Sequence, residues 1–218
     1  MRGGPRTVWS GGADDDAGER AWRRHARPDN EVPVSLALDV MIAATDDIAV
    51  FICGLAVYRN GVDLTVEVRS RPNRSGDDEL LAGDFYGMRS ASRLLFGVEY
   101  ADGRRCANLA VRPDPNADGP QDQPRLRPGG GGGGENVASA SWFLCPLPPP
   151  GALRIYCAWP SAGIAETVTS IDADRILEAA SRVRELWPWE PTTRRPRPLA
   201  RPVLPAEGWF TQFDTPPE

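Results

Sequence analysis

The Asn60-Gly61 pair stands between two alternating apolar segments, and it is the feature that most constrains what this chain can fold into. An Asn-Gly pair favours a type I′ turn, because both central residues of that turn need a positive φ. The flanking residues 48–58 and 62–70 alternate apolar and polar side chains, which is typical of strands with one buried face. We therefore expect an antiparallel hairpin whose register is set by both the turn and the pattern. The expected apolar pairs are Val57–Leu64, Leu55–Val66 and Cys53–Val68.

Similar patterns predict further strands on both sides of this hairpin. An alternating run at 33–43 precedes it, with residues 45–47 as the connecting turn, and a second hairpin is expected at Asp102-Gly103. In that hairpin Val98, Phe96 and Leu94 are expected opposite Ala107, Leu109 and Val111. Later strands are expected at 137–145, 153–159 and 165–171. The sequence thus predicts a mainly β domain, an antiparallel β-sandwich of about seven to eight strands with one C-terminal helix.

That helix is expected from Ala173 to about Leu186, where apolar residues recur at helical spacing. Asp172 is placed to cap it, and Asp174 adds negative charge to the first turn, where the helix dipole favours it. Pro188 would end the helix. Its apolar stripe suits core contact better than a partner site, and consists of Ala173, Ile176, Leu177, Ala180, Val183 and Trp187.

Proline and glycine divide the chain into three parts. There are 22 of each, about a fifth of all residues against roughly 12% on average, and they gather outside most of the alternating segments. We expect a mobile N-terminal extension at 1–31, a domain at 32–189 and a Pro- and Arg-rich tail at 190–218. Within the domain, residues 112–135 contain six consecutive glycines, and we expect them to form a flexible loop. The tail also carries three aromatic residues that either dock on a protein surface or stay exposed, namely Trp209, Phe210 and Phe213.

Charge and hydropathy bear on the class of partner. The net charge of −5 argues against a nucleic-acid-binding protein, which is usually basic. No apolar run approaches the roughly 20 residues of a membrane span, and the first residues lack the apolar segment of a signal peptide. We therefore expect a cytoplasmic protein that binds neither nucleic acid nor a membrane.

The four cysteines show no metal-binding spacing. In a reducing cytoplasm they are expected to be buried thiols. Cys145 and Cys157 flank a predicted hairpin, so an oxidising compartment would allow a disulfide between them.

Few residues are placed for catalysis. The glycine run lacks the lysine of a phosphate-binding loop, because all 25 basic residues are arginine. The one histidine, His25, lies in the segment expected to be mobile, where it could not serve a nucleophile as a base. We expect no metal and no cofactor. Carboxylate chemistry stays open, with Asp46, Asp47, Asp77, Asp78, Asp84 and Glu99 as candidates.

Residues 32–188 resemble a family of uncharacterised proteins from high-GC Gram-positive bacteria. The resemblance is carried by the segment ATDDIAVFICGLAVYRNGVDLTVEVRSRP, by LLFGVEYADGRR, by the glycine run, and by WFLCPLPPPGALRIYCAWPSAGIAETVTSIDADRILEAASRVRELW. It implies that this stretch is one domain, and it implies no activity.

Two classes of function follow. The favoured one is a non-catalytic domain that binds a protein or a small polar ligand through its loops. The alternative is a histidine-independent hydrolase that uses carboxylates and arginines. If the connections at 44–47, 71–92, 112–135 and 160–164 share one end of the domain, they would form a mixed-charge binding surface there. Its expected residues are Asp46, Asp47, Arg89, Arg93 and Arg112.

Overall fold

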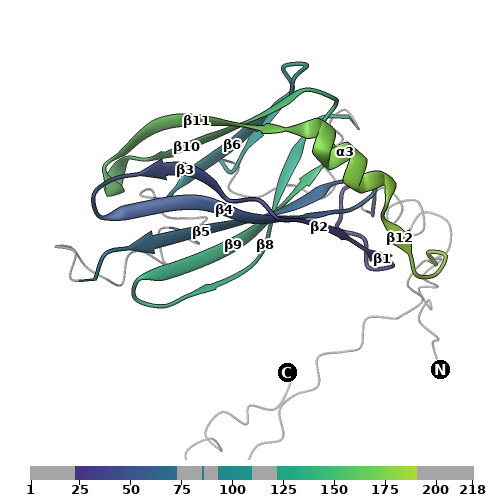
Figure 1. Ribbon diagram of the computed structural model, residues 1–218, viewed down its shortest axis with the longest axis horizontal. Helices are drawn as coiled ribbons and strands as arrows, with labels where there is room; N and C mark the ends of the chain where they lie inside the picture. The colour runs from purple at the N-terminus through teal and green to yellow at the C-terminus, as the bar shows by residue number, and fades with distance from the viewer. Residues whose placement is uncertain (1–22, 73–84, 86–92, 110–121, 191–218) are drawn as a thin grey trace, which may run out of the picture.

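The computed structural model describes residues 23–72, 85, 93–109 and 122–190. The candidate residues at positions 77, 78, 84, 89 and 112 and the aromatic residues at 209, 210 and 213 lie outside this part of the chain. In the described part the fold is mainly β, with twelve strands in antiparallel sheets, one short helix and no closed barrel (Figure 1). None of its helices is long and apolar enough to cross a membrane.

Ten of the strands form two larger sheets. One sheet has six strands: β2 (Val34–Leu36), β3 (Val40–Ala44), β4 (Ile48–Val57), β5 (Val62–Ser70), β9 (Val137–Cys145) and β8 (Arg125–Gly133). Its order is β2-β4-β5-β9-β8, and β3 also pairs with β4. The other sheet runs β11 (Ile164–Asp172), β10 (Ala152–Trp159), β6 (Leu95–Glu99) and β7 (Arg105–Ala107). Two short strands, β1 (Glu31–Val32) and β12 (Arg184–Glu185), pair with each other.

Buried side chains from both larger sheets form one core. Phe96 of β6 stacks on Trp142 of β9, with ring centroids 6.2 Å apart. In β10 the expected alternation is confirmed, because Leu153, Ile155 and Cys157 are all buried. The remaining face of the six-stranded sheet carries a smaller apolar cluster of Tyr58, Phe143 and Cys145.

The first hairpin forms, but its register differs from the expected one by two residues. The Tyr58 amide donates to the Gly61 carbonyl at 2.8 Å, so the turn is centred on Arg59-Asn60, and Val57 pairs with Val62. A shift of two keeps the expected faces near the turn, where Leu55, Val57 and Leu64 are buried. A bulge between Ile52 and Gly54 changes the alternation before that point: Cys53, expected on the buried face, is exposed, and Ile52, Val50 and Ile48 are buried instead.

The second hairpin differs by one residue. Its turn holds three residues, because the Tyr100 amide donates to the Arg104 carbonyl at 2.8 Å and Gly103 adopts φ +85°. Val98 therefore pairs with Cys106 instead of Ala107. The next inward-facing residue is Asn108. Its buried side chain accepts a bond from the Phe96 amide of β6 and donates to the Leu94 carbonyl just before β6. These bonds satisfy a polar side chain where the pattern predicted an apolar one.

The helix is shorter than expected. α3 spans Ala173–Ser181, and Asp172 caps it by accepting a bond from the Asp174 amide at 3.0 Å. The chain then turns to form β12, which pairs with β1. The end of the expected stripe is therefore exposed, and the side chain of Trp187 is 58% accessible.

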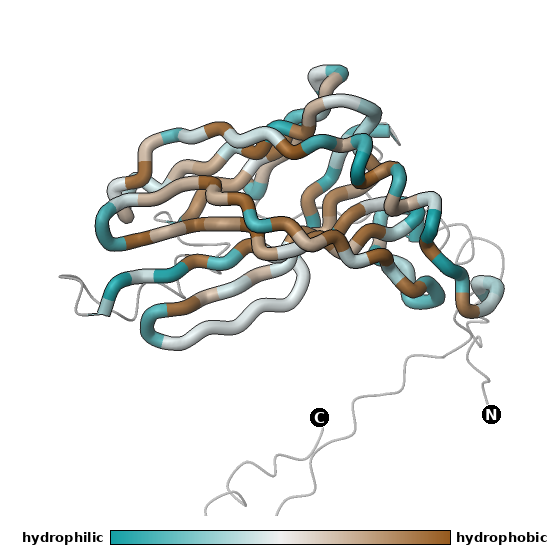
Figure 2. Tube along the Cα trace, in the orientation of Figure 1, coloured by the Kyte–Doolittle hydropathy of each residue, from teal (hydrophilic) through white to brown (hydrophobic). Residues whose placement is uncertain are grey.

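Two segments expected to be flexible are ordered. Residues 23–30 pack on the domain, with His25, Ala26 and Asn30 buried, because their backbone carbonyls and side chains find partners on the first hairpin and β12. Five glycines of the six-glycine run, Gly129 to Gly133, were expected in a loop but continue strand β8, since pairing with β9 uses backbone groups and needs no side chains. Figure 2 shows this glycine stretch as a pale length of tube along the lower edge of the molecule.

Candidate functional site

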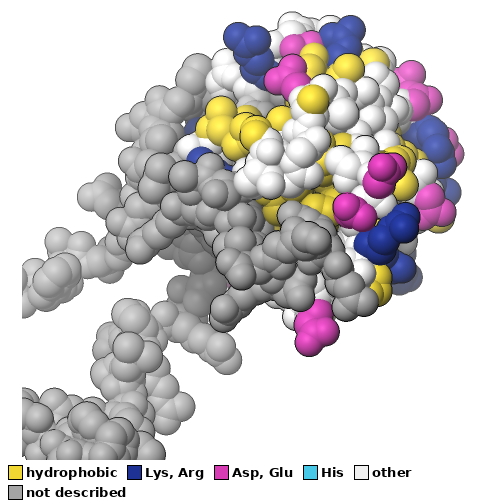
Figure 3. Space-filling model, turned by 90° about the vertical axis from the view of Figure 1, so that its left-hand side faces the viewer, with side chains coloured by type: hydrophobic (Ala, Val, Ile, Leu, Met, Phe, Trp, Pro, Cys, Tyr) yellow, Lys and Arg dark blue, Asp and Glu magenta, His cyan; other side chains and the backbone are white. Residues whose placement is uncertain are grey.

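The expected binding residues fall into two groups. Arg89 and Arg112 lie outside the described residues. Asp46 and Asp47 are exposed in the β3–β4 turn, at the end of the molecule that faces the viewer in Figure 3. On this face the acidic and basic side chains of the described residues are dispersed among others.

Asp47 and Arg93 each have another role in this structure. The carboxylate of Asp47 pairs with Arg71 at 3.7 Å, and the Arg71 amide donates to the Asp47 carbonyl at 2.8 Å. The Arg93 guanidinium donates to the Leu109 carbonyl at 3.1 Å. Both contacts stabilise the ends of strands, so binding at these residues stays a prediction.

The edge of the six-stranded sheet at β8 is a second candidate. Within the described residues β8 is the last strand of this sheet, and it is nine residues long. From Pro128 to Gly133 all its residues are exposed. Edge strands in most proteins carry charged side chains, prolines or bulges that prevent further pairing. In β8, Pro128 and a bulge occupy the middle, while the stretch from Gly131 to Gly133 is regular and has no side chains.

The glycines of β8 are not all required by internal packing. A Cβ on Gly129 would overlap the Ser141 hydroxyl, and one on Gly133 would be 2.8 Å from the Val137 carbonyl oxygen. In contrast, a Cβ on Gly130 or Gly132 would meet no atom within 4 Å. Neither of these two residues has a positive φ. Glycine at such positions is typical where another backbone approaches closely.

The other long edge strand, β11, is joined to its neighbour. The hydroxyl of Thr167 donates to the Ile42 carbonyl at 2.9 Å, and that of Thr169 donates to the Met41 carbonyl at 3.4 Å. These bonds link β11 to β3 and close the gap between the two larger sheets on that side. β11 is therefore held against β3 along this edge.

Charged residues stand at both ends of the glycine stretch. Arg125 and Arg127 precede it, and Glu135 follows it in the two-residue turn to β9, closed by a 2.8 Å bond from the Gly134 amide to the Val137 carbonyl. Arg127 is half-buried beside Phe143, and its Nε has no hydrogen-bond partner. Burial, and then the charge of Arg125, lower the pKa of Arg127. No ion pair in the described part of the chain includes Arg127 or Glu135.

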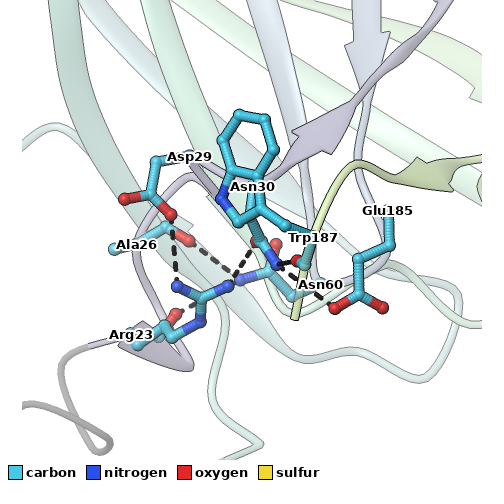
Figure 4. Close-up of polar contacts among 7 residues, drawn as sticks. All are labelled: Arg23, Ala26, Asp29, Asn30, Asn60, Glu185 and Trp187. Carbon is cyan, nitrogen blue, oxygen red and sulfur yellow. Dashed lines mark hydrogen bonds and ion pairs between the residues drawn. The ribbon is translucent and has the colours of Figure 1, made fainter. Parts of the chain in front are cut away.

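A third cluster, drawn in Figure 4, joins the two ends of the described chain. The Asn30 side chain is buried, accepts a bond from Arg23, and donates to the Trp187 carbonyl at 2.9 Å. Asn60 donates to the Ala26 carbonyl at 2.8 Å. The Arg23 guanidinium also lies 4.6 Å from the ring centroid of Trp189. Most polar groups of this cluster bond one another, so its evident role is to hold residues 23–30 in place.

The described residues offer little for catalysis. They contain no group of three or more histidine, cysteine or acidic side chains placed to hold a metal. A recess beneath α3, lined by Leu36, Leu55 and Ile176, encloses about 10 Å³, the room of a single water molecule. Burial lowers the pKa of His25, as do Arg125 and Arg127. His25 is therefore a neutral buried side chain beside two arginines.

The sequence contained a signal for the β8 edge that the glycine run concealed. Arg125-Leu126-Arg127 alternates as a strand does, and only the two residues Glu135-Asn136 separate the glycine run from the strand-like segment after it. Two residues between strand-like segments indicate a hairpin. No protein family, curated protein or solved structure matches this chain, so the interpretation of the site depends on its own residues.

Proposed function

We propose that this protein is a non-catalytic interaction module that binds an extended protein segment by adding it as a strand along β8. The observation that carries this proposal is the exposed glycine stretch at the end of the six-stranded sheet. We also infer that the two larger sheets form a β-sandwich, in which β8 is an edge strand.

Strand addition suits this edge for a physical reason. The outer backbone N–H and C=O groups of an edge strand can pair with an extended peptide. Glycines let that peptide approach closely, because Gly130 and Gly132 have no side chain to occupy the space beside their backbone. A Cβ at either position would meet no atom within 4 Å. A strand rich in glycine is also weak on its own, since each glycine costs about 0.5–1 kcal/mol relative to alanine. Each hydrogen bond to an added strand would offset about 0.5–1.5 kcal/mol of that cost.

The hydrolase alternative has less support. It requires two or more carboxylates that converge in a cleft. Of the described candidates, Asp47 pairs with Arg71, and Glu99 pairs with Arg154 at 2.6 Å. These pairs favour structural roles for both carboxylates.

The test uses two neighbouring proline substitutions. Successive residues of a strand direct their N–H groups to opposite sides, so of Gly131→Pro and Gly132→Pro one removes a bond to β9 and the other removes the N–H group on the outer side of β8. Peptides selected against the full chain from a random displayed library serve as probes. We expect the variant that keeps the wild-type free energy of unfolding to lose peptide binding by tenfold or more. In the wild-type protein, the peptide should shift the amide NMR signals of Gly129 to Gly133.

Selected peptides whose binding tolerates both substitutions, or whose NMR shifts map to Asp46 and Asp47, would contradict strand addition at β8. The second result would instead support the binding surface expected from the loops.

A further inference from the structure

We infer that the outer face of the four-stranded sheet packs on the same face of a second copy of this chain, about a two-fold axis that runs along β10 and β6. This inference goes beyond the proposed function, because it concerns the other larger sheet and uses no residue of β8. Two neighbouring pairs of residues carry it, one matched in size and one matched in charge.

The alternation of β10 and β6 defines the outer face. Leu153, Ile155 and Cys157 of β10 are buried in the core, and so are Phe96 and Val98 of β6. The residues between them therefore point away from the core. The helix α3 packs against β2 and β4 of the six-stranded sheet, so it does not cover this face (Figure 1).

The centre of the outer face is apolar. Tyr156 of β10 lies between Val168 of β11 and Gly97 of β6, and Gly97 in turn lies opposite Ala107 of β7. Val168 is 57% exposed, and Ala107 is exposed as well. The next row of β10 and β6 adds Ala158 and Leu95. An antiparallel sheet usually turns polar side chains to water, so an apolar centre on an outer face indicates a contact surface.

The central row has the sizes that self-contact requires. Tyr156 carries its largest side chain, whereas Gly97 on the neighbouring strand has none. A two-fold axis along the strands exchanges β10 of one copy with β6 of the other, so Tyr156 of each copy would lie over Gly97 of the other. A Cβ on Gly97 would be 3.4 Å from its nearest neighbours, and Gly97 has no positive φ. Packing within one chain therefore leaves room for a small side chain at this position.

The charged row beside Tyr156 fits the same axis. Arg154 of β10 pairs with Glu99 of β6 at 2.6 Å within the chain. The axis would place Arg154 of each copy over Glu99 of the other, and so join two ion pairs into a network of four charges. A two-fold axis across the strands would instead place Arg154 over Ala158 and Glu99 over Leu95, which costs free energy because charges are buried without partners. The charges therefore favour the axis along the strands.

Sedimentation velocity of the full chain over a range of concentrations provides the test. We expect a concentration-dependent species of twice the 23.7 kDa chain mass, because a four-stranded face makes a small interface and hence a reversible dimer. Val168→Arg should weaken dimer formation by tenfold or more, since it introduces a charge into the apolar row. Met41→Arg is the matched control and should dimerise as the wild type does, because Met41 is 55% exposed but lies in β3 of the other larger sheet.

A pair of charge variants tests the contact between copies directly. Arg154→Glu leaves only carboxylates at the two charged positions, and Glu99→Arg leaves only guanidinium groups. Each variant alone should therefore dimerise at least tenfold more weakly than the wild type, because like charges would face each other. An equimolar mixture of the two should dimerise again, since each copy then meets its opposite. Circular dichroism shows that each variant is folded.

A chain that stays monomeric at every concentration would overturn the inference. So would a dimer that Val168→Arg leaves unchanged, or a mixture of the charge variants that stays as monomeric as each alone. None of these variants changes β8, so peptide binding at β8 is measured independently and tests only the proposed function.

Discussion

The backbone carbonyl oxygen of Leu144 lies 2.5 Å from the point at which a Cβ on Gly61 would stand. The ring of Phe143 is nearly as close, at 2.6 Å from the same point. Gly61 is therefore needed for the approach of β9 to the first hairpin. The Asn-Gly pair was interpreted as a turn in which Gly61 needs a positive φ. The turn is instead centred on Arg59-Asn60, so the glycine at position 61 is needed for space and not for its φ.

Gly61→Ala should accordingly destabilise the protein by about 1–3 kcal/mol, the usual cost of overpacking a fixed contact. A methyl group at this position would displace the backbone of β9. Gly54→Ala in the same hairpin is the matched control, since a Cβ there meets no atom within 4 Å. Urea unfolding followed by circular dichroism measures both. Equal free energies of unfolding for the two variants would show that β9 yields to the added methyl group.

Asn60→Asp should release residues 23–30 from the domain. The side-chain amide of Asn60 donates to the carbonyls of Arg23, Arg24 and Ala26, and an aspartate has the same shape without the donors. We expect trypsin to cleave after Arg23 or Arg24 at least several-fold faster in this variant, whereas Arg27 is followed by proline and is not a trypsin site. Asp46→Asn, an exposed change in the β3–β4 turn, serves as the control and should leave the cleavage rate unchanged. An Asn60→Asp protein cleaved at the wild-type rate would show that other contacts hold the segment.

His25 should make the protein less stable in mild acid. Its pKa in the folded protein is lowered from 6.5 by burial and by the nearby arginines. Between the lowered value and 6.5 the unfolded chain binds more protons than the folded one, so the free energy of unfolding falls as pH drops through 6.5. We expect the thermal midpoint of the wild type to fall more between pH 7.5 and pH 5.5 than that of His25→Gln. Parallel pH dependence in the two proteins would place His25 in solvent.

Of the four thiols, one should be alkylated quickly and three slowly. Burial raises the pKa of Cys106 to about 12 and that of Cys145 and Cys157 to about 11 each. Partial burial and the charge of Glu67 raise the pKa of Cys53 as well, but Cys53 is the one exposed thiol of the four and is open to the reagent. At pH 8 a thiol of pKa 11 is thiolate in only about one molecule in a thousand, and the thiolate is the reactive form. Alkylation with detection by mass should add one group quickly, and Cys53→Ser should abolish that addition. After unfolding without reductant all four should react, whereas a Cys145–Cys157 disulfide would leave two.

Several elements follow from local sequence alone. The alternation in 153–159 correctly predicts strand β10, and Asp172 correctly predicts the start of α3. Both features depend on residues that are neighbours in the chain, so local sequence is enough to predict them. The existence of both hairpins was likewise predictable. The mixed-charge binding surface that includes Asp46, Asp47 and Arg93 was inferred from the expected positions of the loops, and it stays a prediction.

Tertiary packing decided the rest. The register of the first hairpin depends on the close contact of Gly61 with β9, which lies about 80 residues later in the chain. α3 ends at Ser181 because the following residues pair with β1, although the helical periodicity continues beyond that point. Likewise, the glycine run has no side-chain pattern of its own, so only pairing with β9 makes it a strand. Periodicity and capping report contacts between near neighbours in sequence, whereas register, helix length and the β8 edge depend on strands that meet only when the whole chain folds.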